Sequence, residues 1–473
     1  MKRAHRRREF LKEAATITAT ASLGGVSTAA DQPSAASQRP GEQAALVIQG
    51  GSLFDPLSGT MQPDRTIVVE GERVRAVGTP TRRATLPQGA RRIDARGKFI
   101  IPGLIDAHVH LVHRLNFAHV TGDEVLPLFL ASGITTLRDT GDEIVAQTLV
   151  ARYAASHPER CPRVFTASYL LDADPPIHRD IGVAVTDPAR VAGVVEDMVA
   201  WRVTTLKIYA RTSRAVGRRI IVEGHRRGLA VTGHLGSYAA QEAVEDGIDS
   251  LEHITSVFDF IIPASARKRP DHRANLDLGN PQARALVGVL AKNRVMVDPT
   301  LTVYRNMLLL SDLPEIHRHP DVAAVPERLR NYWHSYRLTQ GLAAATRERR
   351  RNEFRKYQDL TGILHRAGVP LLAGTDAPEP FCPPGLSLHQ ELELLVESGL
   401  TPAAALRAAT INNARALKQT EHLGSVEAGK IADMVILSAD PTKDIRNTRR
   451  IERVIRGGIC CDPKVLRNAV PSR

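Results

Sequence analysis

The chain has 473 residues, of which 43% are hydrophobic and 24% are charged, and its net charge is +12. This composition is typical of a soluble globular protein. No stretch after the first thirty residues is apolar for long enough to cross a bilayer, so we expect no stable membrane insertion. The basic residues do not alternate with aromatic residues and accompany no nucleic-acid motif, so we expect no nucleic-acid partner.

The amino terminus resembles a twin-arginine export signal. Residues 7–12 read Arg-Arg-Glu-Phe-Leu-Lys, although Arg6 stands where Ser or Thr is usual. The mildly apolar run 14–30 ends in small residues that suit signal-peptidase cleavage. We therefore predict a signal peptide over residues 1–30, a linker over 31–43, the twin-arginine export machinery as a partner, and a periplasmic or secreted protein that is exported folded. The alternative is a disordered basic tail.

Short apolar runs separated by turns follow the linker. They occupy residues 46–48, 66–69 and 74–77, and similar runs return near the carboxyl end at 434–437 and 453–455. Such runs are typical of β-strands, and the two ends of a domain often lie together. We predict a small β-sandwich domain built from both chain ends, residues 44–98 and 424–473.

Between these segments, short apolar strands alternate with helical patterns. We predict one helix over residues 237–246 with Ser237 as its N-cap, and another that begins at Thr401-Pro402. The eight predicted strands cover residues 99–105, 135–138, 163–167, 205–209, 229–234, 250–253, 295–298 and 369–374. This pattern predicts the α/β class, with a (β/α)8 TIM barrel over residues 99–423 and an active site at the carboxyl ends of its strands. The long segments 258–293 and 304–359 are expected to form lids and extra helices.

Potential metal ligands follow several of these strands. His108 and His110 are two residues apart on a strand, so their side chains share a face and can bind one ion. Other strands end in Lys207, His234 and His253, and the last ends in Asp376. Five strand ends therefore offer six candidate ligands to one metal centre.

With these residues the chain resembles the amidohydrolase superfamily, specifically its imidazolonepropionase-like and prolidase-like (Xaa-dipeptidase) branch. The resemblance covers nearly all of the chain after the signal and includes the residues just before the His pair and the Gly-Thr-Asp run that ends at Asp376. It also includes the Ala-Thr-Ile-Asn run at 409–412 and the segment 424–433.

The resemblance implies two divalent metal ions, for which these ligands suit Zn2+. His108, His110 and Asp376 hold one ion, and His234 and His253 hold the other. Lys207 bridges both after carboxylation by carbon dioxide, because an ammonium group has no lone pair to give a metal. Asp376 is also the catalytic base that takes the proton from the bridging water and passes it to the leaving nitrogen.

The leading hypothesis for function is hydrolysis of a carbon–nitrogen amide bond by a metal-bridging hydroxide. The expected substrate is a small-molecule amide or peptide, either a dipeptide or an N-acyl amino acid. One alternative is a mononuclear site that opens a cyclic amide such as imidazolonepropionate or deaminates its substrate. Relatives of that kind carry Glu three residues after the strand-5 histidine, where this chain has Ser237. Another alternative is a noncatalytic barrel scaffold.

Further residues are candidates for the substrate site or for packing in the barrel. Tyr209 lies two residues after Lys207 and is predicted to bind substrate or to pack at the rim of the barrel. His178 follows the third strand and is either a substrate ligand or an exposed loop residue. Arg138 and Asp139 are expected to pair within the barrel, and His113 to lie at its rim. A homo-oligomer is compatible with the sequence.

Overall fold

The protein is seen in a computed structural model that describes residues 45–79, 87–310, 316, 318–335 and 341–470. Residues 43–473 form one compact unit, which contains both sheets. The predicted signal peptide (1–30) and linker (31–43) lie outside the described residues. Within the described ranges, every helix is too short or too polar to cross a membrane.

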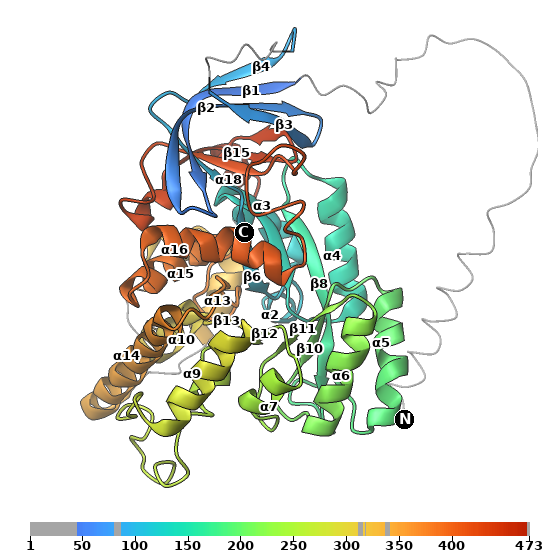
Figure 1. Cartoon of the computed structure of the whole chain (residues 1–473), viewed down its shortest axis with the longest axis vertical. Helices are drawn as coiled ribbons and strands as arrows, with labels where there is room; N and C mark the ends of the chain where they lie inside the picture. The colour runs from blue at the N-terminus through green and yellow to red at the C-terminus, as the bar shows by residue number, and fades with distance from the viewer. Residues whose placement is uncertain (1–44, 80–86, 311–315, 317, 336–340, 471–473) are drawn as a thin grey trace, which may run out of the picture. The chain divides into compact units, whose positions relative to one another are not determined.

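Strands from both ends of the chain form one mixed sheet of eight strands, and not the predicted sandwich (Figure 1). Its order is β16-β15-β14-β5-β1-β2-β3, with β4 paired to β1. The bounds are β1 Leu46–Asp55, β2 Thr60–Glu70, β3 Arg73–Gly78, β4 Arg91–Asp94, β5 Phe99–Pro102, β14 Met434–Leu437, β15 Ile451–Arg456 and β16 Ile459–Cys461.

A single sheet can bury both of its faces here. Side chains alternate between the faces of a strand. Ile100 and Ile436 accordingly join an apolar cluster confined to this sheet and its own loops. Their neighbours Ile101 and Val435 join the large core of the barrel. The barrel therefore takes the place of the second sheet of a sandwich.

The predicted strand over residues 99–105 is two strands. β5 pairs with β1 and β14 in the small sheet, whereas β6 (Leu104–Val109) begins the barrel. Gly103 separates them, and a Cβ atom there would lie 2.2 Å from Oγ1 of Thr135. The absence of a side chain lets the chain pass closely beside the second barrel strand at this point.

The second sheet is the barrel, with seven parallel strands in the order β6-β7-β8-β10-β11-β12-β13. A short strand, β9 (Gly182–Ala184), pairs with β8. The predicted eighth strand is present only as an extended segment, joined by isolated bridges from Leu371 to Val297 and from Ala377 to Val109. These bridges close the ring between its first and last strands. The remaining bounds are β7 Ile134–Asp139, β8 Arg163–Asp172, β10 Thr205–Ile208, β11 Ala230–Gly233, β12 Ser250–Glu252 and β13 Met296–Asp298.

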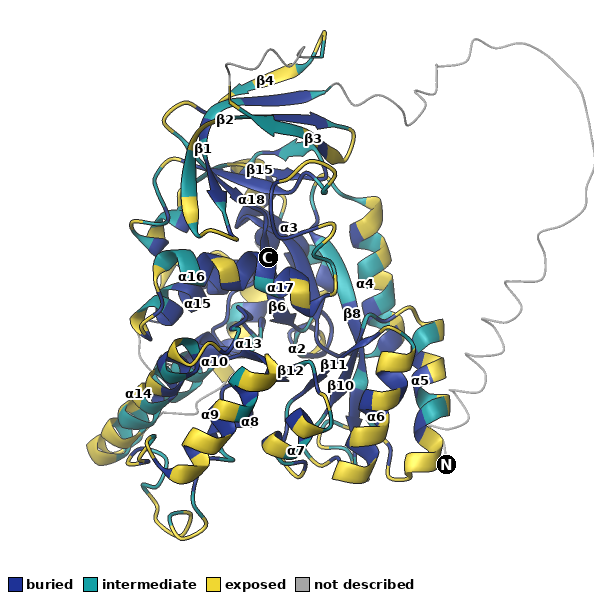
Figure 2. Cartoon of the chain, viewed as in Figure 1, coloured by how far each residue is buried: buried dark blue, intermediate teal, exposed yellow. Residues whose placement is uncertain are grey.

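The helices surround the barrel, with exposed stripes outward and buried stripes inward (Figure 2). The helix predicted over 237–246 is α7, which begins at Ala240 after Ala239 and has no cap from Ser237. Thr401 caps α16 as predicted, accepting from the backbone N–H of Ala404. The bounds are α2 His113–Phe117, α3 Gly122–Ala131, α4 Ile144–Ser156, α5 Val191–Ala200, α6 Arg214–Arg226, α7 Ala240–Glu245, α8 Thr255–Phe258, α9 Pro281–Asn293, α10 Leu301–Arg305, α12 Pro320–Ala323, α13 Glu327–Ser335, α14 Ala344–Arg366, α15 Leu386–Glu397, α16 Pro402–Arg407, α17 Asn413–Ala416 and α18 Pro463–Asn468.

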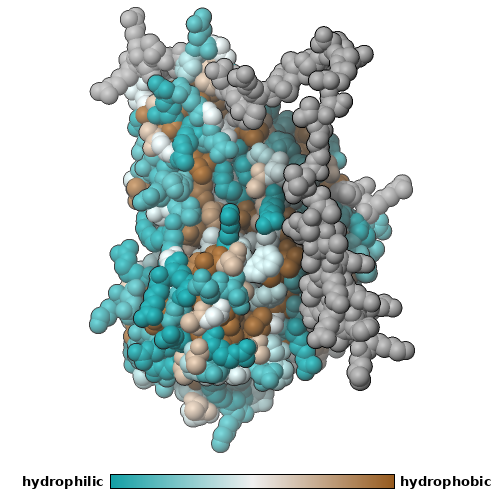
Figure 3. Space-filling view, turned by 90° about the vertical axis from the view of Figure 1, so that its right-hand side faces the viewer, coloured by the Kyte–Doolittle hydropathy of each residue, from teal (hydrophilic) through white to brown (hydrophobic). Residues whose placement is uncertain are grey.

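Short 3-10 and π helices complete the fold, η1 Pro188–Arg190, η2 Asn306–Leu310, η3 Ala408–Asn412 and η4 Ile445–Arg449. The two long segments predicted as lids and extra helices contain α9 and the series from α10 to α14. One face of the molecule, seen in Figure 3, is mostly hydrophilic, with apolar side chains scattered in small groups. The loops and helices that follow the barrel strands can shape a site at the strand ends.

Candidate metal centre

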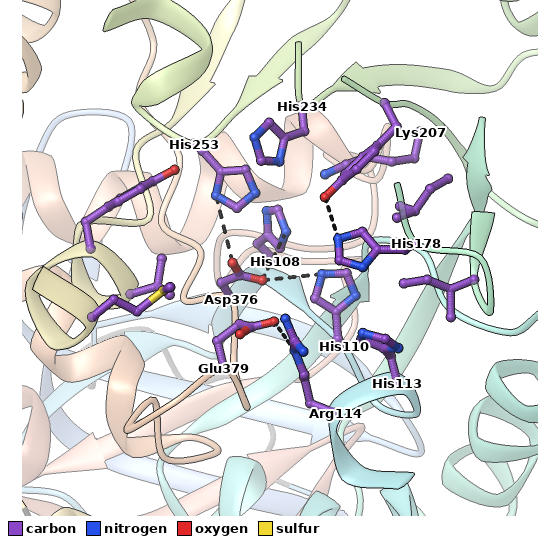
Figure 4. Close-up of a pocket in the computed structure, with 16 residues that line it drawn as sticks. His108, His110, His113, Arg114, His178, Lys207, His234, His253, Asp376 and Glu379 are labelled. Carbon is purple, nitrogen blue, oxygen red and sulfur yellow. Dashed lines mark hydrogen bonds and ion pairs between the residues drawn. The ribbon is translucent and has the colours of Figure 1, made fainter. Parts of the chain in front are cut away.

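A cavity of about 220 Å3 lies at the carboxyl ends of the barrel strands (Figure 4). All six predicted ligands line it, although they come from five separate strand ends. Its lining is His108, His110, His113, Arg114, Leu170, His178, Ile181, Lys207, Tyr209, His234, His253, Val303, Tyr304, Met307, Asp376 and Glu379.

Asp376 lies between His108 and His110, at the end of β6, and His253, which follows β12. Its Oδ1 is 3.3 Å from Nε2 of His110 and 3.6 Å from Nε2 of His108. Its Oδ2 is 3.9 Å from Nδ1 of His253. One carboxylate therefore faces three imidazoles across the cavity floor.

The other predicted ligands line the same cavity. The ring centroids of His234 and His253 are 4.4 Å apart, and those of His108 and His253 are 4.6 Å apart. Lys207 is only 1% exposed. Its Nζ and the Nε2 of His108 are buried atoms without a hydrogen-bond partner in the described structure. Buried polar atoms are normally satisfied, so two such atoms facing one cavity fit a site built for a metal.

Hydrogen bonds on the outer side fix how three of the imidazoles are oriented. Nδ1 of His108 lies 2.8 Å from Oε2 of Glu252, and Nδ1 of His110 lies 3.0 Å from the carbonyl oxygen of Gly141. Nδ1 of His253 lies 2.8 Å from Oγ1 of Thr300. In His108 and His110 the other nitrogen, Nε2, faces Asp376, whereas in His253 the same Nδ1 also lies 3.9 Å from Oδ2 of Asp376. Metal-binding histidines are commonly oriented in this way by a second partner.

Glu252 organises a buried charged cluster beneath the cavity. It accepts hydrogen bonds from Arg138, at 2.6 Å, and from Thr232, and it contacts His108. Arg138 also donates to the carbonyl oxygen of Ala107. The expected pairing of Arg138 with Asp139 is therefore wrong. Asp139 instead accepts from the backbone N–H groups of Leu111 and Gly141, which stabilises the turn after β7.

The charge states of two of the predicted ligands follow from their surroundings. Burial lowers the pKa of Lys207 from 10.5 to about 8, against the attraction of Glu252. Burial opposes ionisation of Asp376, but His108 and His110 outweigh it and hold the pKa of that carboxyl well below its usual range. Asp376 is therefore a carboxylate near neutral pH, which a metal ligand and a general base both require.

Several groups of ligand-type side chains bring their donor atoms within 4.8 Å of one another. One group is His108, His253 and Asp376, which faces the cavity. A second joins His108 to Glu252 and Asp298, which lie on the outer Nδ1 side of the ring. The first group has the nitrogen and oxygen donors and the access that a catalytic ion needs.

Three residues at this centre have strained backbone conformations. His253 has a φ of 67° and Asp376 a φ of 60°, and the β-branched Thr300 has a φ of 45°. Left-handed conformations in residues other than glycine are uncommon, and each costs about 1–3 kcal/mol. Two of the six predicted ligands are thus held in strained positions that the surrounding fold must enforce.

The two predicted substrate residues contact each other. Nε2 of His178 lies 3.0 Å from the hydroxyl of Tyr209, and both side chains line the cavity. His113 is more deeply placed than a rim residue, being 7% exposed. Its Nδ1 lies 2.7 Å from Oδ2 of Asp180, and its Nε2 has no hydrogen-bond partner in the described structure.

The sequence patterns do not single out Glu252, Asp298, Arg114 or Glu379. Nε of Arg114 lies 2.5 Å from Oε1 of Glu379, and this ion pair also lines the cavity. Glu252 and Asp298 occupy the same kind of strand end as the ligands. That position is the signal that could have found them, but it does not distinguish a ligand from a residue that orients one.

A family model described as "Amidohydrolase family" matches residues 99–460. Among curated proteins, an imidazolonepropionase of Geobacillus kaustophilus is 40% identical over 96 residues, which are 20% of this chain and 22% of the relative. Adenine deaminase 3 of Rhizobium meliloti is 27% identical over 288 residues, covering 56% of this chain and 44% of the relative. The chain thus spans less than half the length of each.

Solved structures match over more of the chain. A Xaa-Pro dipeptidase with bound methionine in the active site has a TM-score of 0.66 at 20% identity, covering 89% of this chain and all of that one. A bottromycin amidohydrolase has a TM-score of 0.71 at 24% identity, covering 89% and 88%. At these identities the similarity establishes the fold.

Proposed function

We propose, since this chain belongs to the amidohydrolase family, that it is a metal-dependent hydrolase whose substrate is a dipeptide or an N-acyl amino acid. The observation that carries the proposal is the convergence of six donor side chains from five strand ends on one cavity. The structural similarity to prolidases supports the choice of substrate. Ser237, where mononuclear relatives carry Glu, disfavours a cyclic amide or a deamination.

The proposed centre contains two divalent ions, with Zn2+ as the first choice. His108, His110 and Asp376 would hold one ion, and His234 and His253 the other. Lys207 would bridge them as a carbamate, and its buried, unpartnered Nζ within the described structure supports this role. When bound, such ions activate a water molecule and polarise the carbonyl of the substrate.

The side chains of the chain would supply proton transfer and orientation. Asp376 is placed to take a proton from the attacking water and to return it to the leaving nitrogen. Burial raises the pKa of Tyr209, so its hydroxyl stays protonated and can donate to the substrate carbonyl. His178 would hold that hydroxyl in position through their 3.0 Å contact.

The experiment is a screen of metal-loaded protein against dipeptides, N-acyl amino acids and cyclic amides, with metal content measured in parallel. We expect Asp376→Asn to lower kcat by about 10²–10⁴-fold while it retains part of the metal. Lys207→Ala should lose both metal and activity. The matched control is Asp197→Asn, a change in an exposed aspartate of α5, which should behave as the wild type.

Two results would contradict the proposal. Turnover of cyclic amides without turnover of dipeptides or N-acyl amino acids would reject the substrate class. A purified protein that contains no metal and gains no hydrolytic activity on metal addition would instead support a noncatalytic scaffold.

We also propose export of the folded protein by the twin-arginine route, supported by the Arg7-Arg8 pattern. Cell fractionation tests this proposal. Replacement of both arginines by lysine should keep the protein in the cytoplasm, and equal distribution of the wild type and this variant would reject it.

A further inference from the structure

A second cavity lies at the opposite end of the barrel, where the strands begin. It has a volume of about 240 Å3, and we refer to it as the basal cavity; its lining is Arg294, His365, Gly368, Val369, Pro370, Leu371, Leu400, Ala404, Arg407, Asn412 and Arg415. Leu371 is at the start of the segment that closes the barrel, and Asp376 is at the other end of the same segment. The basal cavity is therefore separate from the metal centre.

Basic side chains from four elements converge on the basal cavity. Arg294 is the C-cap of α9, His365 is in the last turn of α14, Arg407 ends α16 and Arg415 is in α17. Among the described residues, no aspartate or glutamate belongs to the lining. A concave site with one sign of charge concentrates the electrostatic potential and attracts the opposite charge.

These arginines differ from many others on the surface of this protein. Arg214 lies 3.0 Å from carboxylate oxygens of both Glu242 and Asp246, for example. Within the part of the chain that the structure describes, Arg294, Arg407 and Arg415 have neither an ion pair nor a side-chain hydrogen bond. Their positive charge is therefore left uncompensated by the protein.

The nearby helix ends do not account for this charge. α9 and α14 both end beside the basal cavity, and the carbonyl groups at a helix carboxyl end attract cations. In the described structure, however, no guanidinium group of the basal cavity is hydrogen-bonded to those carbonyls. Among the described residues, these guanidinium donors therefore have no hydrogen-bond partner and are open to a ligand from solvent.

We propose that the basal cavity binds a small phosphate-type dianion. The planar guanidinium group donates two parallel hydrogen bonds to a phosphate, so three of them can surround one such group. Val369, Leu371 and Leu400 are almost fully buried and form an apolar floor, which suits the body of an organic phosphate. Burial and the charges of Arg366 and Arg407 lower the pKa of His365, which leaves a neutral imidazole able to donate one hydrogen bond.

Isothermal titration of the metal-loaded protein with inorganic phosphate tests the proposal. The variant is Arg407→Gln with Arg415→Gln, in which both changes are at exposed positions. The matched control is Arg190→Gln with Arg349→Gln, two exposed arginines outside the basal cavity. We expect the first variant to bind inorganic phosphate at least 10-fold more weakly, and the control to bind as the wild type does.

Hydrolytic activity and oligomeric state, measured beside the affinities, test whether the anion binds in the basal cavity. Hydrolytic activity without phosphate should be unchanged in both variants, since none of the four arginines contributes to the metal centre. Equal affinity in all three proteins would overturn the proposal, because binding would then occur at the metal centre or nonspecifically. Loss of an oligomer in the first variant, with no phosphate binding by the wild type, would also overturn it and assign the basal cavity to an interface between copies.

Discussion

Replacement of Glu252 by glutamine should damage both stability and metal binding, because this carboxylate has two partners with different roles. It neutralises Arg138 and contacts Nδ1 of His108, and all three side chains are fully buried. Glutamine keeps the size of the side chain but removes the charge and one acceptor oxygen. Arg138 is then left as a buried cation without a counterion.

The cost can be estimated from the burial of the pair. Breaking a buried ion pair by removing one partner typically costs about 3–5 kcal/mol. The control is Glu452→Gln, the same change in the pair that Glu452 forms with Lys98, whose side chains are 37% and 33% exposed. Exposed pairs contribute about 0–1 kcal/mol. The two variants should therefore differ by several kcal/mol in the free energy of unfolding.

Urea unfolding in the presence of a chelator measures this difference without the contribution of bound metal. Competition with the same chelator then measures metal affinity, which should fall by about 10–100-fold in Glu252→Gln, as for other residues that orient a ligand. Equal unfolding free energies in the two variants would refute the argument from burial. A large loss of stability with unchanged metal affinity would show that Glu252 does not orient His108.

Two other predictions concern pH and packing. Burial and the charge of Arg449 lower the pKa of His389 from 6.5 to about 3. Between these two values only the unfolded chain takes up this proton, so the stability of the folded protein decreases as the pH is lowered below 6.5. His389→Gln should reduce the stability lost between pH 7 and 5.5 by about 1.2 kcal/mol, measured by urea unfolding; an unchanged loss would contradict it. Gly374→Ala would place a Cβ 2.1 Å from Oδ2 of Asp298 and 2.6 Å from Cβ of His108. The stability of this variant should fall by about 1–3 kcal/mol, and it should lose metal. The control is Gly288→Ala in α9, where the added Cβ meets no atom within 4 Å, and this change should be neutral or stabilising. Equal metal content in the two variants would refute the prediction.

The pattern of the sequence was enough to predict the barrel and to select six of the side chains that line its cavity. Strand periodicity is a local property, and parallel strands of a barrel bring their carboxyl ends to one side. His108, Lys207 and His253 could therefore be placed together although up to 145 positions separate them. Motifs at strand ends also supplied the family resemblance, which the match over residues 99–460 confirms.

The tertiary structure decided what these local patterns leave open. The small domain is one sheet because the barrel covers its second face. The alternation of apolar residues along a strand does not reveal which element that strand packs against. Arg138 pairs with Glu252, 114 positions away, and not with its neighbour Asp139, because adjacent residues of a strand point to opposite faces. The basal cavity likewise exists only because four separate elements end at the same place. The sequence by itself determined that the six predicted ligands gather at the mouth of the barrel. Which other groups join them there, and which of them orient or neutralise one another, depended on distances that only the folded chain defines.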